Sequence, residues 1–138
     1  MLGRLVAPLA RLEILPLRVV VGVVFLVHGG QKLFVFGFSG FAGFLSQQGI
    51  EPAIFWSVVV TLVEFLGGIA LVIGLLTRWA ALLLAIDMLV AILVVHLAAG
   101  FFLPKGSEFA LTLLAACLTL LLAGSGPLAV DRAAKLDS

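Results

Sequence analysis

Eight polar or charged side chains lie inside or beside the long apolar runs of this 138-residue chain: Arg18, His28, Gln31, Lys32, Glu64, Asp87, His96 and Glu108. A charged group within a membrane is costly, so each needs a partner, a polar cavity or a route to the surface. Acids, an amine and imidazoles together can bind a polar ligand or relay protons. The alternative is that they only link helices, contributing about 0.6–2 kcal/mol each.

Helical spacing indicates which of these side chains can meet. His28 is three residues from Gln31 and four from Lys32, so the three share one helix face. At about 1.5 Å per residue, His28 and Glu64 reach similar depths near the middle of the bilayer. Lys32, His96 and Glu108 fall nearer the outer surface. The predicted ligand-binding set is His28, Gln31, Lys32, Glu64, His96 and Glu108.

Asp87 is left without a role. His96 follows it by nine residues, which at about 100° per residue places the two on opposite sides of a regular helix. We therefore predict that they do not serve one compact site. Haem ligation by His28 and His96 is disfavoured because their depths differ by about half a turn or more. No pattern assigns a catalytic residue, and no CxxC or zinc spacing predicts a metal site.

The elements that carry these residues must be membrane-spanning helices. Hydrophobic residues make up 64% of the chain and charged residues 11%, whereas a soluble domain has about 45–50% and about a quarter. Lipid is the solvent that such a surface needs. The apolar runs are too long, and alternate too little, for strands. We predict one all-α domain over residues 1–138, an integral membrane four-helix bundle. The net charge of +1 gives no sign of a nucleic-acid partner.

The predicted spans cover residues 15–36, 53–76, 79–100 and 107–123. Residues 37–52, rich in Gly, Phe and Gln, predict an ordered loop or a short interfacial helix. Leucines at helical spacing beside arginines in residues 2–12 predict a segment that lies on the membrane surface. Gly67, Gly68 and Gly74 predict close helix packing.

Lysine and arginine are distributed unequally between the two ends of the predicted bundle. One end holds Arg4, Arg11, Arg18, Arg78, Arg132 and Lys135, and the other holds Lys32 and Lys105. The positive-inside rule then predicts both termini in the cytoplasm. We expect Arg18 to snorkel to that surface, and Arg78 with Trp79 to anchor the interface.

Four motifs in order resemble one family. They are R-x3-G-x2-F-x2-H-G-x2-K in residues 18–32, E-x2-G-G-x2-L-x2-G-L-x-T-R in residues 64–78, H-x3-G-F-F in residues 96–102, and G-S-G-P-L-A-V-D in residues 124–131. Together they resemble the DoxX family of small bacterial membrane proteins, over about residues 18–131. Two segments depart from the family pattern. Residues 124–127 read G-S-G-P where the family usually has G-P-G, and residues 105–108 read K-G-S-E where it usually has G-G-x-E.

The resemblance implies a multi-pass protein of the bacterial inner membrane. Relatives are linked to quinone-coupled sulfur oxidation, as a subunit of a thiosulfate:quinone oxidoreductase. Others are linked to thiol and oxidative stress, together with a superoxide dismutase and a sulfurtransferase. Quinone is the ligand that this resemblance suggests, and the sequence itself requires no cofactor.

Three functions stay open at this point. The first is a redox subunit in which Lys32 with His28 or His96 hydrogen-bonds a quinone carbonyl, and Glu64 and Glu108 set their protonation. The second is a non-catalytic membrane scaffold for soluble redox enzymes, with the polar cluster as a link between helices. The third is a small proton-coupled transporter. Contact with the lipid bilayer is expected in each, and a homo-oligomer is compatible with all three.

Overall fold

The computed structural model describes residues 1–136, which form helices and contain no strand. The longer elements are α2 (Ile14–Gly30), α3 (Gly37–Gln47), α4 (Ala53–Ile73), α5 (Thr77–Ala91) and α6 (Glu108–Ala123). The shorter ones are α1 (Leu2–Val6), η1 (Ala7–Leu12), the π-helices η2 (Gln31–Phe36) and η3 (Ile92–His96), η4 (Leu97–Ala99) and α7 (Val130–Ala133). The prediction of an all-α membrane bundle is confirmed.

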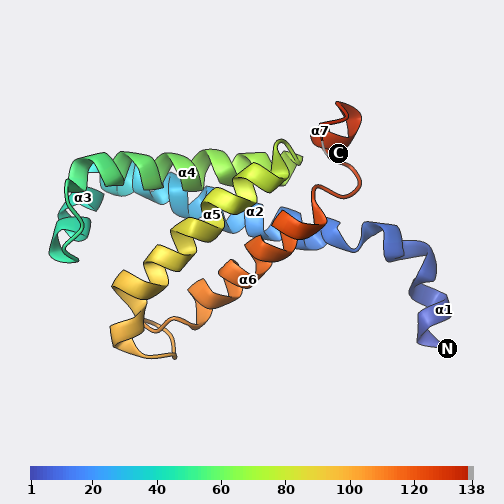
Figure 1. Ribbon diagram of the computed structural model, residues 1–138, viewed down its shortest axis with the longest axis horizontal. Helices are drawn as coiled ribbons and strands as arrows, with labels where there is room; N and C mark the ends of the chain where they lie inside the picture. The colour runs from blue at the N-terminus through green and yellow to red at the C-terminus, as the bar shows by residue number, and fades with distance from the viewer. Residues whose placement is uncertain (137–138) are drawn as a thin grey trace.

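The helices coincide closely with the predicted spans. Within the described residues, Ile14–Gln47, Ala53–Ile73 and Thr77–Ala99 are long and apolar enough to cross a membrane, and Glu108–Ala123 is a shorter apolar helix. Figure 1 shows α2 and α4 side by side, with α5 and α6 as a second pair inclined to them. The segment predicted as a loop or interfacial helix forms α3, which follows η2 directly and turns away from α2 at Gly37, where φ is +69° (Figure 1).

Glycines allow α2 and α4 to approach until their backbones touch. A Cβ added to Gly68 would lie 2.3 Å from the Leu26 backbone nitrogen, and one added to Gly29 would lie 2.4 Å from that of Phe65. Gly22 faces the Val72 backbone in the same way. Such close contact suits lipid, where helices associate by packing rather than by the hydrophobic effect. The predicted role of Gly68 in packing is confirmed.

The second pair packs on the first through apolar side chains. Leu71 of α4, Leu84 of α5, and Cys117 and Leu120 of α6 are fully buried in one core. Gly67 faces this side, since its added Cβ would lie 3.2 Å from the Leu84 side chain. The two neighbouring glycines of α4 therefore serve two different interfaces.

The chain after α6 folds back and ties the helices together at the end of the bundle that carries both termini. We call the contacts of Arg18 and Asp131 at this end the lock. Arg18 is 1% exposed and donates to the carbonyls of Ser125, Pro127 and Leu128. Asp131 accepts from the backbone N–H groups of Leu76 (2.5 Å) and Thr77 (2.8 Å) at the start of α5. The expectation that Arg18 reaches the surface is wrong, because these carbonyls satisfy its charge inside the protein.

Two further contacts complete this end. Arg78 donates to the carbonyls of Leu121 and Leu122 at 2.6 and 2.8 Å, where the last turn of α6 leaves them without helical partners. Residues 2–12 are helical, as their spacing predicts, and extend away from the bundle with Leu2, Leu5 and Leu9 exposed (Figure 1).

Candidate functional site

A cavity of about 360 Å³ lies between the helices at the end of the bundle opposite the chain termini. Its walls are mostly apolar, and they include Phe25 of α2, Phe41 and Phe44 of α3, and Phe109 of α6. Five ionisable side chains also line it: His28, Lys32, Glu64, Asp87 and His96. The volume and the small number of polar groups are typical of a small-molecule site.

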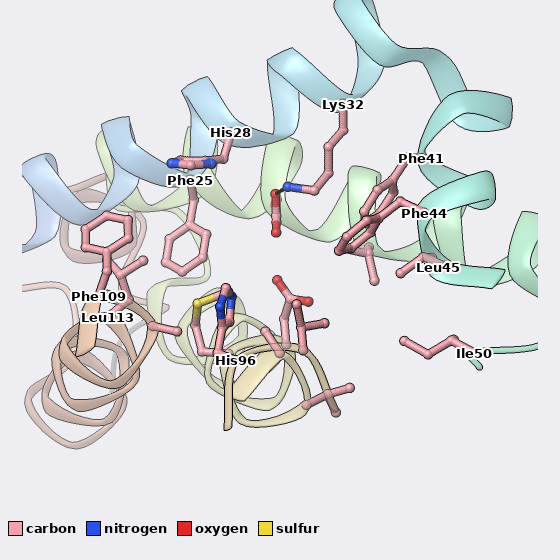
Figure 2. Close-up of a pocket in the computed structure, with 18 of the residues that line it drawn as sticks. Phe25, His28, Lys32, Phe41, Phe44, Leu45, Ile50, His96, Phe109 and Leu113 are labelled. Atoms are coloured by element: carbon pink, nitrogen blue, oxygen red, sulfur yellow. Dashed lines mark hydrogen bonds and ion pairs between the residues drawn. The ribbon is translucent and has the colours of Figure 1, made fainter. Parts of the chain in front are cut away.

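Lys32 and Glu64 form an ion pair inside this cavity. The Lys32 Nζ lies 2.7 Å from Glu64 Oε2, and the two side chains are only 16% and 6% exposed. Figure 2 shows the Lys32 ammonium reaching down from the η2 side toward the carboxylate. The same ammonium lies 5.2 Å from the centre of the Phe41 ring, within cation–π range. Charge and aromatic surface therefore meet at one point of the cavity.

The partner of Glu64 is Lys32, and not His28, which the similar depths of His28 and Glu64 in the bilayer had suggested. We expected His28 to meet Glu64, but Gly29 packs directly on the backbone of Glu64 and Phe65. That contact leaves the next helical turn, with its long flexible Lys32 side chain, to reach the carboxylate. His28 lies at the rim instead, exposed, with its ring 6.2 Å from that of Phe109.

Asp87 and His96 line the same cavity, which sequence spacing argued against. The reason is the π-helix η3, which begins five residues after Asp87 and ends at His96. A π-helix has wider turns than an α-helix, so each residue rotates less and the two side chains come round to one side. Asp87 interacts electrostatically with Glu64 and, with opposite sign, with Lys32.

His96 is fixed in orientation by the loop that leads into α6. Its Nδ1 lies 2.9 Å from the carbonyl oxygen of Lys105. Gly106, the next residue, packs so tightly on the backbone of Phe101 and Phe102 that an added Cβ would lie 2.3 Å from an oxygen. Figure 2 shows the His96 ring pointing into the cavity below Phe25 and His28.

Two predicted members of the site lie outside the cavity. Gln31, the first residue of η2, is exposed and does not line the cavity. Glu108 begins α6 and is half-buried; it does not line the cavity, although its neighbour Phe109 does. Phe101 and Phe102 also lie outside the cavity and are exposed.

The geometry can bind and orient a ligand rather than hold a metal. Within residues 1–136, no group of three or more His, Cys, Asp or Glu side chains is placed to bind a metal ion. An ammonium, two carboxyls and two imidazoles around apolar walls can hydrogen-bond the oxygens of a flat, mostly apolar molecule. They can also accept or release its protons.

Comparison with known proteins gives one family. The family model of DoxX matches residues 13–97, which include Lys32, Glu64, Asp87 and His96. A Bacillus subtilis protein provisionally named an oxidoreductase, CatD, is 36% identical over 115 residues, covering 83% of this chain and 81% of its own.

Two further relatives are bacterial. An uncharacterized protein of Haemophilus influenzae is 34% identical, with 83% of this chain and 85% of its own covered. An uncharacterized membrane protein of Mycobacterium tuberculosis is 34% identical, with 87% and 80% covered. No solved structure matches the chain. The extent of the family match and the coverage of these relatives place this membrane protein in the DoxX family.

Proposed function

We propose that the cavity binds a quinone or a similar small redox ligand, and that the protein is a membrane subunit of a redox or thiol-stress system. The observation that carries this proposal is the Lys32–Glu64 ion pair facing an aromatic-walled cavity of ligand size. The provisional oxidoreductase name of CatD supports the same direction. By this proposal the protein works in the bacterial inner membrane, alongside soluble redox enzymes.

The ion pair itself argues for a ligand. Burying two charges costs several kcal/mol each, and a buried pair is often no more stabilising than apolar residues of the same volume. Here the pair borders an open cavity and lies against Phe41, so it contacts whatever fills that space. A quinone dissolves in lipid, so it can enter between helices from the side of the bundle.

The first experiment identifies small molecules that copurify with the protein. The chain is purified in mild detergent from its own membranes, and bound lipids and quinones are measured by mass spectrometry for the wild type, Lys32→Met, Glu64→Gln and the double variant. We expect each single variant to lose most of the retained ligand while still folding. The double variant should lose less ligand binding than the sum of the two single losses, because Lys32 and Glu64 belong to one network that is lost only once.

Glu13→Gln is the matched control, since Glu13 is an exposed acid at the opposite end of α2. It should retain ligand like the wild type. If no small molecule is retained, or if Lys32→Met and Glu64→Gln lower only thermal stability, the cavity is not a ligand site. The scaffold function would then be the better account, with the ion pair linking α2 and α4.

A further inference from the structure

The polar groups that face the cavity offer more hydrogen-bond acceptors than donors. The Asp87 Oδ2 atom is buried and has no hydrogen-bond partner. Glu64, with which Asp87 interacts, is another carboxyl, and a hydrogen bond between two carboxyls needs a shared proton. Lys32 is the one ammonium among the lining residues, and it is engaged by Glu64. A buried polar atom without a partner is costly, so Asp87 calls for a donor.

His96 adds a second acceptor. Its Nδ1 faces a carbonyl oxygen, that of Lys105, and a carbonyl can only accept. Nδ1 must therefore carry the hydrogen, and in the neutral ring Nε2 is left with a lone pair. The ring points into the cavity (Figure 2), so this lone pair is available to a ligand.

We propose that the cavity selects a ligand that brings hydrogen-bond donors, namely a hydroxyl-bearing aromatic ring such as a diphenol. This is the reduced counterpart of a quinone, richer by two hydrogens. The inference rests on the proposed function, because it specifies which form of the redox ligand the same cavity prefers.

The chemistry of the two forms explains the choice. A quinone carries carbonyl oxygens that only accept, so it leaves Asp87 Oδ2 without a donor and places lone pairs against a carboxyl. A diphenol oxygen can donate its hydrogen to Asp87 or His96 and accept one from Lys32. The ring itself suits the phenylalanine walls in both forms, so only the hydroxyl hydrogens separate them.

The test compares three probes that share one ring: trimethylhydroquinone, trimethyl-1,4-benzoquinone, and the dimethyl ether of the hydroquinone. The ether keeps both oxygens but has no hydroxyl hydrogen. Binding to the full-length protein in lipid nanodiscs is measured without oxygen by equilibrium dialysis. We expect the hydroquinone to bind about tenfold or more tightly than the other two, because it supplies a donor to a buried acceptor that otherwise has none.

Asp87→Asn then assigns the preference. Asparagine keeps the shape and supplies an N–H₂ donor, so the ratio between hydroquinone and quinone should fall several-fold, toward the preference that His96 alone provides. Glu13→Gln should keep the wild-type ratio. Equal or tighter binding of the quinone or the ether, or an unchanged ratio in Asp87→Asn, overturns this inference and leaves a ligand site in place. Absence of binding by all three probes overturns the proposed function as well.

Discussion

At the scale of single residues, the protein handles buried positive charge in two ways at its two ends. Arg18 is surrounded by backbone carbonyls, whereas Lys32 is paired with Glu64. The carbonyls leave no room for a ligand, and they tie α2 to the chain after α6. The Lys32 pair borders a cavity. This difference separates a structural charge from one that can act on a ligand.

The Arg18 contacts predict a large structural effect. Arg18→Met should lower the free energy of unfolding by about 2–4 kcal/mol, because it removes charged hydrogen bonds and leaves buried carbonyls without a donor. The stability of Arg18→Lys should lie between those of the wild type and Arg18→Met, because an ammonium cannot donate to several separate carbonyls as a guanidinium does. Thermal unfolding in detergent measures both. Arg11 is exposed and lies before α2, so Arg11→Met should leave the free energy of unfolding nearly unchanged. An equal loss of stability in Arg11→Met and Arg18→Met would contradict the role of Arg18.

Glu51 gives a prediction about pH. The Ser46 hydroxyl at 2.5 Å and the Ala53 N–H at 2.9 Å hold the pKa of this carboxyl below its usual value of 4.5. A carboxyl whose pKa is lower in the folded than in the unfolded state stabilises the fold at pH values above its unfolded-state pKa. This stabilisation is lost as the pH falls through its folded-state pKa.

Hydrogen exchange of the amides in residues 49–53 should therefore quicken, relative to its intrinsic rate, as pH is lowered from about 5 to about 3. Glu51→Gln should already exchange faster at pH 6 and should lack this additional pH dependence. Because Glu51 is exposed, the effect is local, and global stability should change little. Identical profiles for the two proteins would mean that the carboxylate does not hold this turn.

Residue types alone predicted part of this picture. Lys32 and Glu64 stood out because ionisable groups are rare in apolar runs, and the structure places both in the cavity. The contacts of Arg18 could not be predicted, since its partners are backbone carbonyls more than 100 residues away, which carry no signature in side-chain type. Asp87 was left aside because its position depends on a local change of helix type.

At the scale of elements, two π-helices decide which side chains reach the cavity. η2 carries Lys32, which reaches into the cavity, and η3 brings His96 round to the side of Asp87. The four long helices followed from the length of the apolar runs, but a regular period of 3.6 residues cannot predict where a helix widens. The prediction that Asp87 and His96 cannot share one site was therefore wrong because of η3.

Two neighbouring glycines allow a sharp test of packing. Gly68→Ala should lower stability by about 1–3 kcal/mol or more, because the added Cβ meets the Leu26 backbone at 2.3 Å and the helices must separate. Gly67→Ala should cost less, since its Cβ meets only the Leu84 side chain at 3.2 Å, which can move.

Gly43→Ala is the control for both, because nothing lies within 4 Å of an added Cβ there and alanine favours a helix. It should be neutral or slightly stabilising. Thermal unfolding in one detergent ranks the three variants. A Gly67→Ala protein that is less stable than Gly68→Ala would contradict the close packing of α2 on α4.

At the scale of the whole molecule, the two ends of the bundle have different tasks. One end carries both chain ends, most of the arginines and the lock formed by Arg18 and Asp131. The other carries α3, the loop before α6 and the cavity (Figure 1). The charge bias would then place the lock at the cytoplasmic surface and the cavity toward the outer one.

This orientation can be tested with reporters that work on only one side of the membrane. Alkaline phosphatase is active only after export, and green fluorescent protein folds only in the cytoplasm. Each is fused after Ser138, which lies outside the described residues, or inserted between Ser46 and Gly49, in the turn between α3 and α4. We expect the terminal fusion to fluoresce and the inserted phosphatase to be active, because an even number of spans returns the chain to its starting side.

Removing three positive charges provides the control. Changing Arg4, Arg11 and Arg78 together to Gln lowers the bias from six against two to three against two, and it leaves the buried Arg18 in place. The opposite reporter pattern should then appear in a fraction of the molecules, since orientation follows lysine and arginine near the ends of the spans. Matching reporter results at both insertion points in the wild type would instead mean an even number of spans between them. That outcome would place the cavity and the lock on the same side of the membrane.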